Sequence, residues 1–210
     1  MNRVSTRRRS PRVWLLAALV AAVAVMTSSC SAMAAFGDSF NRAMQGESAT
    51  ITTFARDGQP MDSVHGMSVN FSRDSRFDTK SSDGTTNSDS SVVLISIGNS
   101  HMEHVGSTMI VAQDGLGTVA GPGKVTISNT QSGMPWLNDI LEMNRNLWKG
   151  KAKIILIRSQ NDVPLAVYAG NEVDLFATDI PKSTWFRVDG KNLLVYRANM
   201  TIYDADLFQS

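Results

Sequence analysis

From position 49 onward, apolar residues mostly alternate with polar ones or form short β-branched runs, and this pattern predicts strands. The first two, Ala49–Ala55 and Met61–Phe71, flank Asp57-Gly58, a dipeptide typical of tight hairpin turns. Polar residues fill Lys80–Ser90, which predicts an exposed loop. The further predicted strands are Ser91–Ile97, Thr108–Gln113, Lys124–Ser128, Lys153–Ile157, Leu165–Tyr168, Val173–Ala177, Trp185–Val188 and Leu193–Met200. Turns at Gly170-Asn171 and Asp189-Gly190 predict that the last four form two hairpins.

One segment, Pro135–Gly150, has the period of a helix instead. Its apolar face collects Trp136, Leu137, Ile140, Leu141, Leu147 and Trp148. Proline suits a first helical position and glycine a helix end. We therefore expect an α+β fold: a mostly antiparallel, curled or barrel-like sheet of about eight to ten strands with one major amphipathic helix. An N-terminal signal or lipid-anchor segment precedes it.

The beginning of the chain has the three-part order of a secretory signal. Arginines occupy Arg3 to Arg12, an apolar run follows over Val13–Met26, and small residues follow that run. The apolar run has fourteen residues, which is shorter than the roughly 20 that a membrane-spanning helix needs. The sequence therefore predicts export from the cytosol.

Three outcomes of export remain open. In the first, the chain is cut before Cys30, which accepts a lipid, although Thr27 stands where a leucine-like residue is usual. In the second, the cut follows Ala34 in Ala32-Met33-Ala34; in the third, Val13–Phe36 stays as an uncleaved anchor. The first organises the chain into a lipoprotein signal peptide (1–29), a tether or short helix (30–47) and a single β-rich domain (48–210). It places that domain at the extracytoplasmic face of the cell membrane, held by the lipid on Cys30.

Composition and charge agree with an exported globular domain. The chain has 210 residues, of which 42% are hydrophobic and 19% charged, which excludes a disordered chain. Cys30 is its only cysteine, so no intramolecular disulfide forms. The formal net charge of +1 hides five arginines within residues 1–29; the remainder has 15 basic and 19 acidic groups. That acidic remainder argues against nucleic acid as a partner.

The histidines are the candidate metal ligands. His101 and His104, with Glu103 between them, would share the face of a helix and could bind zinc there. The flanking glycines favour a strand or turn, and a strand would place His101 and His104 on opposite faces. His65 could join them from another strand. We therefore expect no metal site or cofactor, and no catalytic residue is identified.

Other candidate binding residues are aromatic or basic. Trp185 follows Pro181 and could be an exposed aromatic ring on which a sugar stacks. Lys149, Lys151 and Lys153 belong to the densest basic stretch, which could lie against anionic lipid or a wall polymer. The simpler interpretation of the lysines is a helix end followed by a strand with outward side chains.

Several stretches resemble a family of exported Gram-positive bacterial lipoproteins known as a domain of unknown function. They are Ala49–Thr53 with Asp57-Gly58, Val64–Gly66, Arg76–Thr79, His101–Ser107, Ile157–Asn161, and Lys182–Thr184 through Tyr203-Asp204. The resemblance implies an envelope location and no known catalytic residues.

We therefore expect a tethered, non-catalytic binding or interaction module at the cell envelope. Its partners would be the membrane, through Cys30 or an uncleaved anchor, and an envelope protein or wall polymer. The alternative is an envelope hydrolase or metal-binding protein that uses His101 or His104 with nearby carboxylates.

Overall fold

The computed structural model describes residues 39–120 and 150–208. The chain divides into two units, Met1–Ala35 and Phe36–Ser210, and all the described residues belong to the second. Residues 39–43 form a short helical segment, which lies within the predicted tether or short helix. The other regular structure of the described ranges consists of fifteen strands and two short 3-10 helices.

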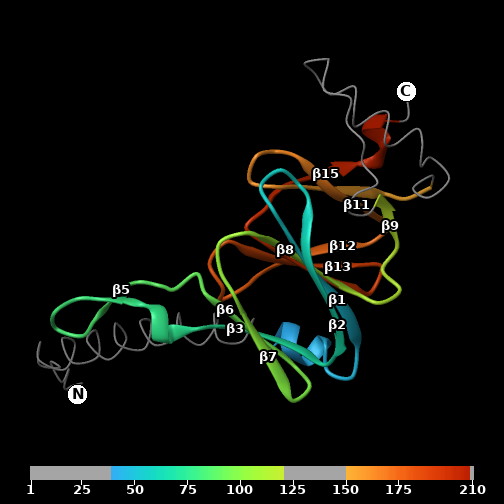
Figure 1. The fold of residues 1–210 in the computed structure, drawn as a ribbon. Helices are drawn as coiled ribbons and strands as arrows, with labels where there is room; N and C mark the ends of the chain where they lie inside the picture. Colours follow the sequence, from blue (N-terminus) through green and yellow to red (C-terminus); the bar gives the residue numbers. More distant parts are fainter. Residues whose placement is uncertain (1–38, 121–149, 209–210) are drawn as a thin grey trace, which may run out of the picture. The chain divides into compact units, whose positions relative to one another are not determined.

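The largest sheet joins strands from the first and last parts of the domain, and every pairing in it is antiparallel. In spatial order, its strands are β12 (Val173–Ala177), β13 (Ser183–Val188), β14 (Lys191–Tyr196), β8 (Thr108–Gln113), β1 (Ser48–Phe54) and β2 (Pro60–Met67) (Figure 1). At its centre, β8 pairs with β1 on one side and with β14 on the other.

Three smaller sheets complete the described domain. The four-stranded sheet consists of β15 (Asn199–Asp204), β10 (Lys153–Arg158), β11 (Pro164–Gly170) and β9 (Thr118–Ala120). The three-stranded sheet consists of β3 (Val69–Arg73), β6 (Val93–Ile97) and β7 (Ser100–His104). The 3-10 helix η1 (Ser75–Phe77) leads into a hairpin of β4 (Thr79–Lys80) and β5 (Thr86–Ser88), and η2 (Ala205–Phe208) follows β15. The β4–β5 hairpin extends beyond the ends of β3 and β6 (Figure 1).

The central strands of the six-stranded sheet are buried on both faces, because their alternate residues enter two different cores. Met109 and Val111 of β8 pack with residues of the three-stranded sheet, such as Phe71 and Ile95. Ile110 of β8 faces the other way, toward residues of the four-stranded sheet. Burial on both faces explains the continuous apolar runs of these strands.

The predicted fold class is wrong in its architecture. The described sheets are antiparallel and β-rich as expected, but they are four open sheets in layers rather than one curled or barrel-like sheet. No major amphipathic helix is present in the described residues; the one predicted over Pro135–Gly150 and the strand over Lys124–Ser128 lie outside them, apart from Gly150. Among those residues, no helix is both long and apolar enough to cross a bilayer.

Two predicted strands are each divided by a residue with positive φ. Ser68 (φ 53°) separates β2 from β3, and Arg197 (φ 52°) is the first residue of the break between β14 and β15. The strands on either side of each break belong to different sheets. The chain therefore passes from one layer to the next at these positions. A residue with left-handed backbone interrupts the pairing of a strand, but it leaves the alternation of apolar and polar residues unchanged, so the sequence pattern does not show the break.

Candidate functional site

The three histidines occupy three separate environments. His65 lies exposed on β2, with Nε2 2.8 Å from Oδ2 of Asp114. His101 is exposed on β7, whereas His104 is buried, and its Nε2 lies 3.0 Å from the carbonyl oxygen of Ser107. No group of three or more His, Cys, Asp or Glu residues that could hold a metal exists in the described part of the chain. The structure thus does not bring the histidines together.

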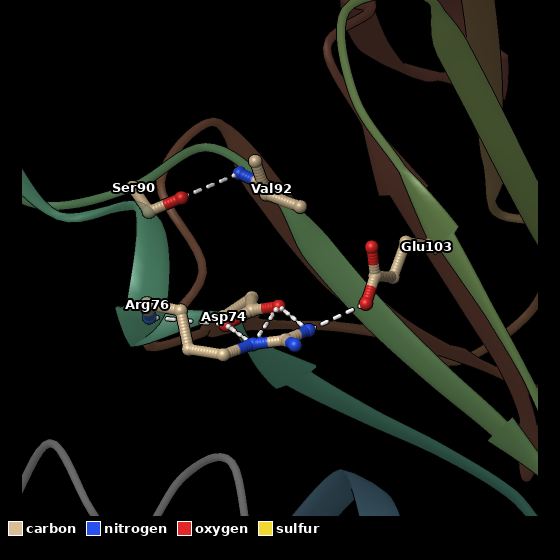
Figure 2. Close-up of polar contacts among 5 residues, drawn as sticks. All are labelled: Asp74, Arg76, Ser90, Val92 and Glu103. Atoms are coloured by element: carbon tan, nitrogen blue, oxygen red, sulfur yellow. Dashed lines mark hydrogen bonds and ion pairs between the residues drawn. The ribbon is translucent and has the colours of Figure 1, made fainter.

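Glu103, between these histidines, is engaged by an arginine (Figure 2). Arg76 Nη2 donates to Glu103 and also to Asp74, whose carboxylate further accepts from Nε of Arg76 at 2.9 Å. Asp74 is the N-cap of η1 and accepts the backbone N–H of Arg76 at 3.0 Å. The guanidinium of Arg76 holds the pKa of Asp74 below its usual range. Because the pKa of Asp74 is lowered, its carboxyl group stays ionised near neutral pH and has no proton to donate as a general acid.

A second ionic cluster lies where the chain enters and leaves the β4–β5 hairpin. Asp78 accepts the backbone N–H of Ser90 at 2.8 Å and pairs with Arg73, which also lies 3.0 Å from Asp89. Ser90 Oγ in turn accepts the backbone N–H of Val92 at 2.9 Å (Figure 2). The two clusters hold the β4–β5 hairpin to the three-stranded sheet, which is a structural role.

We predict that Asp74→Asn lowers the urea midpoint of unfolding at pH 7 and that this difference shrinks toward pH 3. The pKa of Asp74 is lowered in the folded state, so its ionised form stabilises the fold above the unfolded pKa of about 3.9. That contribution is lost as the pH falls through the lower folded pKa. Urea unfolding at both pH values measures it, with Asp174→Asn on exposed β12 as control. An equal difference at both pH values would contradict the role of the ion pair.

The structure contradicts the prediction that Trp185 is an exposed sugar-binding ring. Trp185 is only 2% exposed, and Phe176 stacks on it with ring centroids 4.2 Å apart. Its Nε1 donates to Oδ1 of Asn192 at 3.0 Å. Strand β13 packs against both cores, with Trp185 in one and Phe186 in the other, so the position after Pro181 does not determine exposure.

The basic stretch is largely neutralised where the structure describes it. Lys151 Nζ lies 2.7 Å from Asp189, and Lys153 Nζ lies 2.5 Å from Asp204. Lys149 lies outside the described residues. The simpler interpretation, a strand with outward lysines, accounts for both described residues.

A pocket of about 340 Å³ lies where β13 and β15 begin and β14 ends. Small-molecule sites usually span about 300–1,000 Å³, so its volume suits a small ligand. Its lining residues are Gln160, Lys182, Ser183, Thr184, Arg197, Ala198, Asn199 and Met200.

The backbone at this pocket is unusual. Lys182 (φ 64°) and Arg197 (φ 52°) both adopt the left-handed conformation, next to the last paired residues of β13 and β14, Ser183 and Tyr196. The backbone N–H of Arg197 donates to the carbonyl of Lys182 at 2.8 Å. Thr108 Oγ1 donates to the carbonyl of Arg197 at 2.7 Å. These bonds hold the two basic residues side by side despite a conformation that costs about 1–2 kcal/mol each.

The polar groups of the pocket are suited to binding rather than to proton transfer. Its lining contains neither a carboxylate nor an imidazole. Ser183 Oγ donates to the carbonyl of Ile180 at 2.8 Å and also contacts Thr178 Oγ1, so it is not poised as a nucleophile. Gln160 Nε2 donates to the carbonyl of Gly106 at 2.8 Å, which holds the amide in place.

A second hollow, of about 460 Å³, lies beside the helical segment and is lined by Asn41, Arg42, Gln45, Ser68 and Asn70. The Asn41 amide in this lining is already used, because it bonds both to the N–H of Phe71 at 2.8 Å and to the Phe71 carbonyl at 3.0 Å. We therefore take the pocket at Lys182 and Arg197 as the candidate site.

A family model matches residues 12–208, nearly the whole chain, and its description is domain of unknown function (DUF5052). The chain belongs to the DUF5052 family. This confirms the resemblance to a domain of unknown function, and the DUF5052 description names no activity or ligand. No curated protein and no solved structure matches the chain.

The candidate pocket was missed by the sequence reasoning. Its residues come from three separate parts of the chain, around Gln160, Lys182–Thr184 and Arg197–Met200. One available signal for these residues was the family resemblance, because Gln160 and Lys182–Thr184 lie within the stretches that resemble the family. Nothing in the sequence indicated that Lys182 and Arg197 would adopt left-handed conformations.

Proposed function

We propose that this protein is an extracytoplasmic, membrane-anchored lipoprotein of a Gram-positive type that acts as a non-catalytic binding module at the cell envelope. The order of arginines, apolar run and small residues before Cys30 supports export and lipid attachment. A diacylglyceryl group with a further acyl chain buries many methylenes, each contributing about 0.8 kcal/mol, and so anchors the domain stably. The membrane is then its first partner, and an envelope protein or wall polymer is the second.

The observation that favours binding over catalysis is the lining of the candidate pocket. It offers cations, amides and hydroxyls, and no carboxylate or imidazole. The hydrolase alternative needs His101 or His104 beside a free carboxylate, whereas Glu103 is engaged by Arg76 and His104 by Ser107. His65 on the edge strand β2 does face Asp114, which directly follows β8, but both side chains are exposed and neither lines a described pocket.

We predict that Cys30→Ser abolishes lipid labelling of the full-length chain expressed in a Gram-positive host. The thiol of Cys30 is the acceptor of the diacylglyceryl group in this proposal, and a serine hydroxyl does not replace it. Incorporation of an alkyne-labelled palmitate measures the modification, and globomycin should cause the unprocessed precursor to accumulate. Ser29→Ala, which keeps a small residue beside the cut, is the matched control and should retain the label.

Two results would overturn the lipid anchor. One is equal labelling of the wild type and Cys30→Ser. The other is an intact mass of the mature protein that corresponds to a cut after Ala34. An unlabelled, uncut chain in the membrane fraction would replace the lipid with an N-terminal anchor.

A further inference from the structure

We propose that the pocket at Lys182 and Arg197 binds a phosphate-type oxyanion. This inference deepens the proposed function, since it names the ligand class of the same site. It concerns the described domain alone and does not depend on how the chain is anchored. A phosphate group could be presented by a wall polymer, a free phosphate ester or a lipid headgroup, and all three share the same charged oxygens.

The first argument is uncompensated positive charge. Neither Lys182 nor Arg197 takes part in an ion pair with a described carboxylate, unlike Lys151 and Lys153. A third cation, Arg158, pairs in register with the lining residue Asn199 and donates its Nη2 to the hydroxyl of Thr201 at 2.6 Å.

The acid that contacts the pocket lining is Asp162, which accepts a hydrogen bond from Asn199 Nδ2 at 2.7 Å. No described hydrogen bond or ion pair joins an acid to Arg158, Lys182 or Arg197, so the charges of these three basic residues are not paired. The local charge therefore favours an anionic ligand over a cationic or neutral one.

The second argument is the supply of hydrogen-bond donors. Arginine and lysine donate only, and amide and hydroxyl groups from Gln160, Thr184 and Asn199 join them around the pocket. An oxyanion accepts several hydrogen bonds at once, and bonds between charged groups are the strongest of these. The guanidinium of Arg197 lies over the Tyr196 ring, 6.0 Å from its centroid, which restricts its position. The donors are thus arranged before a ligand arrives.

The third argument is that the backbone conformation does not serve stability. Among the described residues, most positions with positive φ are glycines, and the others are Ser68, Asp162, Asp189, Lys182 and Arg197. Short polar residues tolerate this conformation far better than long side chains do. The two long side chains with positive φ both line this pocket. Strain that clusters at one pocket indicates that these side chains are needed there.

The experiment measures phosphate binding by the full-length chain in detergent micelles. Calorimetric titration with inorganic phosphate is compared between the wild type, Lys182→Gly and Arg197→Asn, at constant ionic strength set with chloride. Glycine and asparagine suit a left-handed backbone, so both variants should keep or raise the thermal midpoint. We expect each to weaken phosphate binding roughly tenfold or more, because each removes a charged donor.

The matched control is Lys80→Gln, which removes one positive charge from the exposed β4 strand. It should bind phosphate as the wild type does. Amide chemical shifts of Thr184 and Asn199 in the wild type should move on titration, which tests the location without any substitution. Glycerol 3-phosphate and short-chain phosphatidylglycerol, titrated in parallel, distinguish a polymer-like or free ester from a lipid headgroup as the source.

The inference is overturned if phosphate has no more effect than chloride, or if Lys182→Gly and Arg197→Asn bind it as tightly as Lys80→Gln does. It is also overturned if the shifts concentrate away from Thr184 and Asn199. Loss of the palmitate label from the wild type would refute the anchor but leave these titrations unchanged. The two failures are therefore distinguishable.

Discussion

Trp185→Ala is expected to lower the free energy of unfolding by about 3–5 kcal/mol, the usual cost of removing a large buried aromatic side chain. The ring of Trp185 contacts Phe40 edge-on, with centroids 5.7 Å apart, and stacks on Phe176. Its truncation leaves a cavity in the core between the six-stranded and three-stranded sheets. It also removes the donor to Asn192 Oδ1, and Asn192 is itself only 4% exposed.

Urea unfolding followed by circular dichroism measures this loss. Phe77→Ala is the matched control, because the Phe77 ring is 54% exposed and its removal should cost well under about 1 kcal/mol. Trp185→Phe separates packing from hydrogen bonding, since it keeps a ring but leaves Asn192 Oδ1 without its donor. A cost for Trp185→Ala no larger than that for Phe77→Ala would contradict the buried position.

Gly66→Ala is expected to destabilise the protein by about 1–3 kcal/mol, because the added methyl group has no room. A Cβ at Gly66 would lie 2.2 Å from Cγ2 of Ile97. Gly66 belongs to β2 of the six-stranded sheet and Ile97 to β6 of the three-stranded sheet, so the backbone of one sheet approaches a side chain of the other. A glycine within a strand often marks such a close approach.

Thermal or urea unfolding of Gly66→Ala tests the contact. The control is Gly117→Ala, where a Cβ would meet nothing within 4 Å and φ is not positive. The double variant Gly66→Ala with Ile97→Ala should lose less free energy of unfolding than the sum of the two single losses, because the alanine at position 97 makes room for the added methyl group. Simple additivity of the two losses would rule out the clash.

Local features of the fold were predictable from the sequence. The strand over Thr108–Gln113 has the predicted bounds, and the β1–β2 and β13–β14 hairpins form at the predicted Asp57-Gly58 and Asp189-Gly190 turns. The strand interpretation of His101 and His104 is also confirmed. These features depend on turn residues and on alternation within a few positions, which the sequence displays directly.

The assembly of strands into sheets was not predictable in the same way. The hairpin expected between Leu165–Tyr168 and Val173–Ala177 does not form, because β11 joins the four-stranded sheet and β12 the six-stranded one. An apolar run buried on both faces carries no information about which layer lies on which side. The same ambiguity concealed the burial of Trp185.

The candidate site was least predictable, because its two basic residues meet only through a long-range pairing. Lys182 and Arg197 are brought together by the β13–β14 ladder. Their left-handed backbone breaks the usual preference for glycine or asparagine, so composition gave no warning of it. Residues that contradict local rules in this way are often functional ones.

The central position of β8 has a consequence for biogenesis. Ala112 of β8 pairs with Thr50 of β1, but its other neighbour is Leu193, near the end of the chain. A chain synthesised from its N-terminus contains β1, β2 and β8 long before it contains β14. The six-stranded sheet therefore stays incomplete until β14 is available, and sheets that need such distant partners assemble slowly.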